Sequence, residues 1–332
     1  MDTTNVQHDH RGTDVPDCPM LQRLEDLIAD QSVEEIWLNS PDRVFAARDG
    51  QTFVTGIVMN CQDLERLVAT LLLPSGRRLD ALSPFVDAAL PDGSRLHVVA
   101  SGVAGPHLAV NIRKFPAVSW SLADLVARGM CSDEQADWLR HEICSGASIL
   151  VSGATHTGKT TLLRACINEL PPVSRVVVCE EVGELRPHRL DTASLQTRSP
   201  SLEGHGEISL RELVVQALRM RPDMLVVGEV RQAEAFDLLL ALSSGIPGMG
   251  TIHAKNATGA LRKLATLALL AGSNVTTEFV VPTVATCVNS VVQLQRDSAG
   301  RRRIAEVASV SLCEGSLEAI AIDLRPSSQM AA

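Results

Sequence analysis

The chain has 332 residues, of which 45% are apolar and 21% charged, and its formal net charge is −9. This length predicts two domains, each large enough to bury its own core. The acidic balance, an aromatic content of 3% and the lack of tyrosine argue against binding through nucleic-acid phosphates or base stacking. No nucleic-acid partner is therefore expected.

The cysteines and the apolar patterning place the chain in the cytoplasm. Eight cysteines form no Cys-x-x-Cys pair, so we expect small buried apolar side chains in a reducing compartment rather than zinc ligands or disulfides. No stretch approaches the roughly 18 consecutive apolar residues of a membrane span. The first 20 residues are too polar for a signal peptide.

The N-terminal third has the pattern of a small α+β domain. Residues 1–20 lack periodicity and are predicted to be a mobile tail, and the domain is predicted over 21–114. Apolar residues three or four apart predict helices, and short apolar runs between turn residues predict strands. The helices are expected near 21–28 and 64–72, and the strands near 36–38, 44–45, 53–54, 96–100 and 108–112. Residues 115–119 are predicted to be a linker.

From residue 120 to residue 332, apolar strands alternate with helices, which predicts an α/β domain with a parallel sheet. One helix is expected after Ser209-Leu210-Arg211-Glu212, which has the pattern of a capping box. A late antiparallel pair is expected around the turn 297–300. Strands are predicted near 149–151, 176–179, 224–227, 288–294 and 304–310, with further helices near 159–170, 233–242 and 258–270.

A phosphate loop is the most specific motif of the sequence. The segment 153–160 reads Gly-Ala-Thr-His-Thr-Gly-Lys-Thr and matches G-x-x-x-x-G-K-[ST] between a predicted strand and a predicted helix. Its backbone amides and the helix N-terminus would surround the phosphates. Lys159 would place its charge at the β- and γ-phosphates, and the Thr160 hydroxyl would bind Mg²⁺. The predicted nucleotide-binding residues are Gly153, Ala154, Thr155, His156, Thr157, Gly158, Lys159, Thr160 and Thr161.

Glu229 directly follows another buried strand, so it would face the same phosphates at the carboxyl edge of a parallel sheet. Such an acid can hold Mg²⁺ through water or polarise the attacking water, although a solvated acid after a strand is common. Other polar residues are, by type alone, more often structural or solvated than catalytic: Glu180, Glu181, Glu184, His253, Arg95, Arg113, Arg198 and Arg231.

Several segments match one known family at once. They are the hairpin 35–44, the signatures 76–80 and 90–95, the acidic box 180–185, the loop segments 197–198 and 203–207, the region 217–231 and the histidine box 250–254. Together they resemble the hexameric traffic ATPases of type II and type IV secretion and pilus systems. Within that family, the pattern is similar to the Tad/Flp-pilus branch, also called the CpaF type.

The resemblance implies a RecA-like P-loop ATPase domain beside a smaller N-terminal α+β domain, with ATP bound between them in a homohexamer. It implies Mg²⁺-dependent hydrolysis that powers pilus assembly or protein secretion through polytopic inner-membrane platform proteins. The enzyme would then be cytoplasmic and docked peripherally on the inner membrane.

The resemblance also implies roles for individual side chains. Glu229 becomes the Walker B acid, which positions Mg²⁺ partly through water together with Thr160. Glu181 and Glu184 become second acids of the site, and His253 becomes a γ-phosphate sensor. Arg95 and Arg113 become arginines that domain closure delivers to the nucleotide. Arg198 and Arg231 are implied in sensing or in contact between subunits.

The phosphate loop departs from this family where Ala154 and His156 replace the usual glycines. Glycine permits a positive φ at low cost, whereas histidine has to tolerate it. A second hypothesis is therefore a nucleotide-binding scaffold with impaired hydrolysis. A third, a RecA-like nucleic-acid motor, is disfavoured by the acidic charge and the scarcity of aromatic residues.

Overall fold

A computed structural model describes residues 19–48, 50–81, 83–114, 119–198 and 205–324. The predicted tail, except for its last two residues, and most of the predicted linker lie outside these ranges, as do residues 203–204 of one predicted loop. Contacts divide the chain into two units joined within 115–118. Among the described helices, each is too short or too polar to cross a lipid bilayer.

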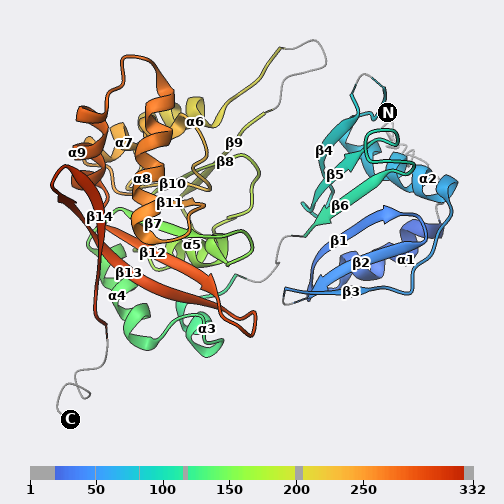
Figure 1. Ribbon diagram of the computed structural model, residues 1–332, viewed down its shortest axis with the longest axis horizontal. Coiled ribbons are helices and arrows are strands. Elements are labelled where there is room, and N and C mark those ends of the chain that lie inside the picture. Colours follow the sequence, from blue (N-terminus) through green and yellow to red (C-terminus); the bar gives the residue numbers. More distant parts are fainter. Residues whose placement is uncertain (1–18, 49, 82, 115–118, 199–204, 325–332) are drawn as a thin grey trace, which may run out of the picture. The chain divides into compact units, whose positions relative to one another are not determined.

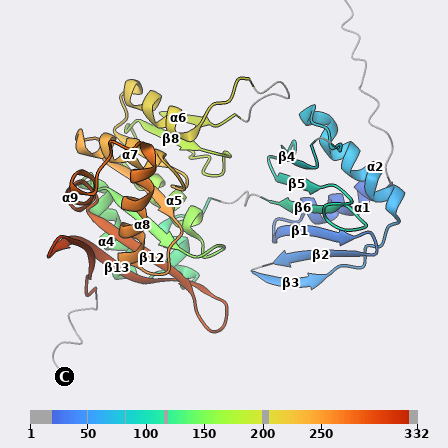
Figure 2. The same cartoon turned by 45° about the horizontal axis from the view of Figure 1, so that its top comes forward.

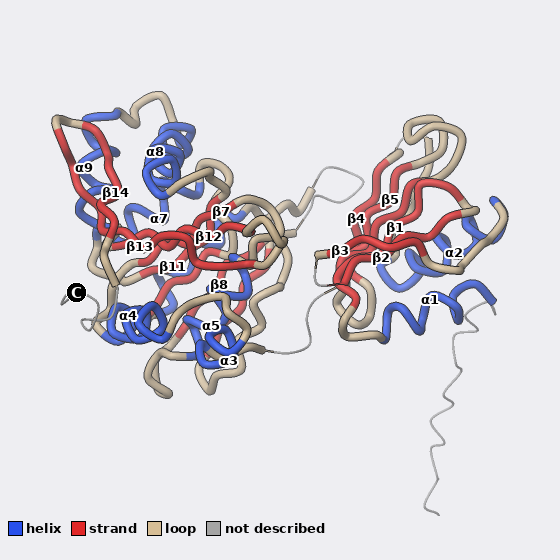
Figure 3. The backbone as a smooth tube through the Cα atoms, turned by 60° about the horizontal axis from the view of Figure 1, so that its bottom comes forward, coloured by secondary structure: helices blue, strands red, loops and turns tan. Residues whose placement is uncertain are grey.

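The first unit is a six-stranded antiparallel sheet in the order β3-β2-β1-β6-β5-β4, which Figure 2 shows strand by strand. Helices α1 and α2 cover one face of this sheet (Figure 3). Leu24 of α1, Leu64 of α2 and Ile36 of β1 belong to one buried cluster there, because alternate strand residues point to the helical face. The elements are α1 (Pro19–Ala29), β1 (Val33–Ser40), β2 (Arg43–Arg48), β3 (Gln51–Val54), α2 (Cys61–Leu72), η1 (Leu73–Ser75), β4 (Phe85–Ala89), β5 (Arg95–Val99) and β6 (Ala109–Arg113).

The second unit contains an eight-stranded sheet in the order β14-β13-β12-β7-β11-β10-β8-β9 (Figure 1). The strands from β12 to β9 are parallel, and β13 and β14 extend the sheet antiparallel. Its strands are β7 (Ile149–Gly153), β8 (Val176–Glu180), β9 (Thr192–Gln196), β10 (Met224–Val227), β11 (Gly248–Ile252), β12 (Ser290–Arg296), β13 (Arg302–Cys313) and β14 (Ser316–Ala321).

Helices cover both faces of this sheet (Figure 3). Leu150 points to one core, whereas its neighbours Ile149 and Val151 point to the other, so the parallel strands read as continuous apolar runs. One core contains α3 (Leu122–Ala127), α4 (Asp133–Cys144) and α5 (Lys159–Asn168). The other contains α6 (Leu210–Ala217), η2 (Leu218–Met220), α7 (Glu234–Ser243), α8 (Ala257–Ala268), η3 (Leu269–Ala271) and α9 (Thr277–Cys287).

The predicted α/β fold with an N-terminal α+β portion is confirmed, including the antiparallel pair β12–β13 and the capping box of α6, where Ser209 and Glu212 bond reciprocally. The sequence pattern did not predict β4, β9, β11, β14, α3, α4 or α9. Helix α9 contains Pro282, which interrupts a helical pattern, and β9 is only partly buried, so its apolar signal is weak.

The prediction of buried cysteines holds for Cys131, Cys166 and Cys179 and is wrong for Cys61 and Cys144. The two exposed cysteines are the first residue of α2 and the last residue of α4. Both helices turn their apolar stripe to the core at other positions, so these terminal side chains face the solvent.

Candidate active site

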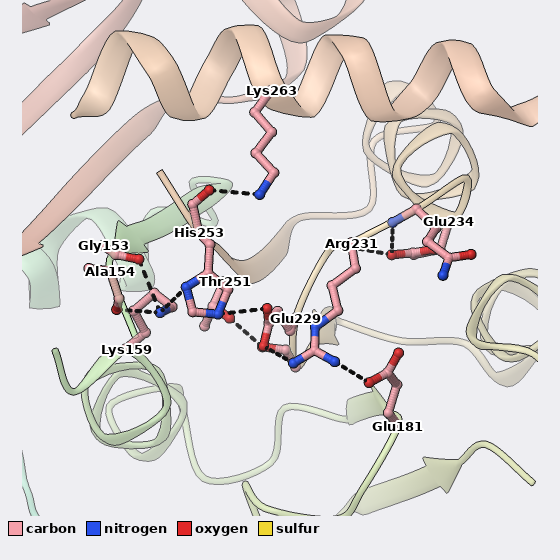
Figure 4. A network of polar contacts seen from close by, with 12 residues as sticks. Gly153, Ala154, Lys159, Glu181, Glu229, Arg231, Glu234, Thr251, His253 and Lys263 are labelled. Atoms are coloured by element: carbon pink, nitrogen blue, oxygen red, sulfur yellow. Dashed lines mark hydrogen bonds and ion pairs between the residues drawn. The ribbon is translucent and has the colours of Figure 1, made fainter. Parts of the chain in front are cut away.

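Four neighbouring parallel strands end at the same edge of the second sheet, and each delivers one part of the site. Strand β7 runs into the phosphate loop, β8 ends at Glu180, and β10 and β11 are followed by Glu229 and His253. Residues about 100 positions apart along the chain thereby converge, as expected for the carboxyl ends of parallel strands. Figure 4 shows the resulting polar network.

The phosphate loop packs tightly against neighbouring segments of the chain. A Cβ on Gly153 would lie 2.6 Å from the Thr157 hydroxyl and 2.7 Å from the carbonyl oxygen of Leu294, so only glycine fits there. Gly158 has a φ of 93°, and His156 also lies in the left-handed region, with a φ of 58°. Histidine is one of the non-glycine residues enriched in that region. The loop therefore adopts the conformation that its missing glycine would favour.

Lys159, the first residue of α5, is buried and points back into the loop. Its Nζ donates to the carbonyl oxygens of Gly153 and Ala154, at 3.1 and 2.9 Å, and lies 3.1 Å from the Nδ1 of His253. Because the ammonium can only donate, this Nδ1 is the acceptor and the proton of a neutral imidazole lies on Nε2.

His253 joins the lysine to the acid at the end of β10. Its Nε2 lies 2.9 Å from the Oε1 of Glu229. Burial and the charge of Lys159 lower the pKa of His253, which keeps the ring neutral at pH 7. Lys263 of α8 fixes the same segment by donating to the carbonyl oxygen of His253 at 2.9 Å.

Arg231 bridges two acids of the site. Its guanidinium donates to the Oε2 of Glu229 and to the Oε2 of Glu181, each at 2.7 Å. Burial raises the pKa of Glu229, but the hydrogen bond from Arg231 and the nearby charges outweigh it, so the pKa lies below its ordinary value. Glu229 is therefore ionised at neutral pH.

The carboxylate of Glu229 retains capacity for another ligand. Its buried Oε1 makes no well-aligned hydrogen bond to any of the described residues, although the Nε2 of the neutral His253 ring lies 2.9 Å away. A buried anionic oxygen without a well-aligned donor suits a hard cation or an ordered water. The residues present therefore fit the Mg²⁺ that the phosphate-loop motif implies.

Two residues outside the predicted site, Glu180 and Thr251, pack beside Gly228, the residue before Glu229. Glu180 is 4% exposed, and its Oε1 accepts hydrogen bonds from the backbone amides of Glu184 and Leu185 at 3.1 and 3.0 Å. Burial raises the pKa of Glu180 to about 7. The Thr251 hydroxyl donates to the carbonyl oxygen of Gly228 at 2.6 Å and so holds the turn before Glu229. The sequence signal for Glu180 was its place as the last residue of an apolar run.

Of the remaining predicted residues, only Glu184 lies near this network. The charge of Glu184 contributes to raising the pKa of Arg231, so this acid is close to the network. Arg198 instead fastens its own loop, because its Nε donates to the carbonyl oxygen of Gly206 at 2.6 Å. Arg95 and Arg113 belong to the first unit, where they are direct cross-strand partners on β5 and β6.

Comparison with known proteins assigns this arrangement to a family. The family model described as type II/IV secretion system protein matches residues 20–318. The chain belongs to this type II/IV secretion system family. The predicted class of enzyme, a secretion-system ATPase, agrees with the family, with the complete phosphate loop and with the fold.

Relatives of this secretion-system protein are named for conjugal transfer and for type IV secretion. A protein of Mycobacterium tuberculosis named for conjugal transfer is 35% identical over 308 residues, which cover 90% of this chain and 87% of that protein. The type IV secretion system protein PtlH of Bordetella pertussis is 32% identical over 271 residues, 74% of this chain and 79% of PtlH. The X-ray structure of the Legionella pneumophila ATPase DotB shares the fold, with a TM-score of 0.63 at 21% identity, over 88% of this chain and 81% of DotB.

Proposed function

We propose that this chain hydrolyses ATP and uses the energy to drive a secretion, conjugation or pilus machine. The observation that carries the proposal is the continuous chain of contacts from Lys159 through His253 and Glu229 to Arg231, beside a complete phosphate loop. These contacts link the Lys159 ammonium of the phosphate loop to Glu229, the acid best placed to act on the attacking water.

In the proposed reaction, Lys159 exchanges the carbonyl oxygens of its own loop for the phosphates of ATP. This exchange alters its contact with His253, so the ring reports the presence of the γ-phosphate to Glu229. Glu229 is ionised and can orient or polarise the attacking water, a role that Glu181 or Glu184 would share.

Mg²⁺, when bound, would neutralise charge that develops on the phosphates. The Thr160 hydroxyl and the carboxylate of Glu229 are the groups that would hold it, the latter partly through water. Arginines can lower the barrier to ATP hydrolysis by neutralising the same developing charge. Arg95 and Arg113 are our candidates in the first unit, and Arg231 and Arg198 in the second.

The proposal extends to the assembly. Six copies would form a ring, each with an N-terminal domain over 21–114 and an ATPase domain over 120–332. The ring would work in the cytoplasm against inner-membrane platform proteins. The relatives named for conjugal transfer and type IV secretion support a machine of that kind, and the motifs that resemble the Tad-pilus branch support a pilus version.

Turnover of Mg-ATP by the purified chain tests the proposal. We expect Lys159→Ala to abolish nucleotide binding and turnover, and Glu229→Gln to bind ATP but lose at least 100-fold in kcat, about the effect of losing one catalytic group. Replacement of the exposed Lys255 by alanine is the matched control. Absence of turnover in the unaltered protein, together with full function of Lys159→Ala in the host's transport assay, would refute it.

The other two hypotheses predict different results in the same assay. A large gain in turnover for His156→Gly would indicate an impaired native loop and a scaffold role. ATPase activity that rises with DNA and falls steeply with salt would indicate a nucleic-acid motor. We favour the active motor, because His156 already adopts the left-handed conformation that the loop requires.

A further inference from the structure

The hairpin of β12 and β13 reaches the apex of the phosphate loop. Arg296, the last residue of β12, donates from Nε and from one terminal nitrogen to the carbonyl oxygen of His156, at 3.1 and 3.0 Å. Arg302, the first residue of β13, donates from its Nε to the same oxygen at 3.1 Å. One backbone carbonyl thus accepts three bonds from two guanidiniums.

The strand pairing within the hairpin brings these two guanidiniums together. Arg296 and Arg302 are direct cross-strand partners, so their side chains leave the ribbon on the same face. Asp297 closes the turn between them, accepting from the amides of Ala299 and Arg301, each at 2.9 Å. Like charges placed opposite each other on a β-ribbon repel. The shared acceptor, a carbonyl oxygen with partial negative charge, offsets part of this repulsion.

The hairpin also contacts the loop at its two glycines. A Cβ on Gly153 would collide with the carbonyl oxygen of Leu294 in β12. A Cβ on Gly158 would lie 3.5 Å from the Cδ of Arg302 and 2.9 Å from the Cε of Met130. The amide of Ile304 donates to the carbonyl oxygen of Met130 at 2.7 Å, which fixes the hairpin to the segment before α4.

We propose that Arg296 and Arg302 are positioning residues that hold the phosphate loop open for nucleotide, by fixing His156 in its left-handed conformation. The inference rests on the proposed function, because it concerns the same nucleotide site. L-residues rarely occupy this region without help. If His156 leaves the left-handed conformation, only the fraction of molecules that still has it can bind nucleotide. The apparent affinity for nucleotide then falls in proportion to that fraction.

Hydrogen exchange of the nucleotide-free protein tests the positioning role without nucleotide. We expect the amides of 153–160 to exchange about tenfold faster in Arg296→Ala/Arg302→Ala than in the unaltered protein, since local opening sets the exchange rate. Amides of α8 report whether the variant is folded and should exchange at the original rate. Arg303→Ala, on the neighbouring position of β13, removes an equal charge and should leave the loop unchanged.

Nucleotide affinity supplies the second measurement. We expect the Kd for Mg-ADP to rise about tenfold in the double alanine variant, and by no more than about threefold when the same pair is replaced in a His156→Gly background, where glycine occupies the left-handed region unaided. Arg→Lys at both positions keeps the charge but loses the planar fork, so it should retain most of the defect.

The proposal would be overturned if the amides of 153–160 exchanged at an unchanged rate in the double alanine variant, or if the affinity for Mg-ADP fell equally in the two backgrounds. It would also be overturned if the double lysine variant recovered full affinity, because charge alone would then explain the effect. Failure of the unaltered protein to bind nucleotide would instead refute the proposed function, and the exchange measurement would still decide the role of the two arginines.

Discussion

Replacement of Glu180 by glutamine should stabilise the protein at high pH and leave it nearly unchanged at low pH. The carboxyl group of Glu180 is buried at the end of β8, and burial raises its pKa from 4.5 to about 7. The folded state therefore keeps this proton up to about pH 7, whereas the unfolded chain releases it near pH 4.5. Between these values, the free energy of unfolding falls as pH rises, and above pH 7 the loss is complete.

The size of the effect follows from the difference between the pKa of Glu180 in the unfolded chain, 4.5, and in the folded state, about 7. At about 1.4 kcal/mol per pH unit, ionisation of buried Glu180 costs the folded state about 3 kcal/mol at pH 8. Glutamine carries no charge, yet its side-chain oxygen can still accept from the amides of Glu184 and Leu185. We therefore expect Glu180→Gln to gain up to about 3 kcal/mol over the unaltered protein at pH 8, and less than about 1 kcal/mol at pH 5.

Denaturant unfolding at both pH values, in EDTA and without nucleotide, measures this difference. Trp120 and Trp138 report on the second unit by fluorescence. Glu207→Gln, at an exposed glutamate of the same unit, should stay within about 0.5 kcal/mol at each pH. An advantage of Glu180→Gln that is equal at pH 5 and pH 8, or a loss at pH 8, would show that the folded state accommodates the charge of Glu180 and that the reasoning is wrong.

Three other substitutions test separate contacts. Gly228→Ala places a Cβ 2.8 Å from the Cγ of Glu180, so we expect a loss of about 1–3 kcal/mol in thermal unfolding, and an unchanged melting temperature would contradict the contact. Arg231→Ala removes a group that lowers the pKa of Glu229, so the acidic limb of the kcat/KM profile should move to higher pH; a fixed limb would exclude Glu229 as its source. Leu64→Ala should destabilise the first unit by about 2–5 kcal/mol, as followed by Trp37 fluorescence, and a cost below 1 kcal/mol would contradict the packing of α2.

Features that depend on near neighbours in the sequence were predictable. The capping box of α6 needs only Ser209 and Glu212, and the phosphate loop needs only the spacing of its glycines and lysine. The position of Glu229 was also accessible, because it follows an apolar strand, whereas His253 was singled out only by the family resemblance. The chain supplies these signals locally, within a few residues of the side chain that uses them.

Burial could not be deduced in the same way. Glu180 and Glu181 are adjacent in the sequence, yet one is enclosed beside Gly228 and the other is half-exposed and paired with Arg231. Which of two neighbouring acids turns inward depends on the direction of the last strand residue and on what packs against it. Neither is encoded by residue type.

The sequence by itself determined the α/β class, the phosphate loop and the acids that follow its strands, because local propensity and hydrophobic period act over short distances. Only the tertiary structure showed which arginines contact the acids and the phosphate loop of the candidate site. By residue type alone Arg231 did not stand out, and the family resemblance ranked it below Arg95 and Arg113. Arg296 lies 140 residues from the carbonyl that it contacts. Such pairs arise where the order of strands in the sheet brings distant segments together, and no spacing along the chain specifies that order.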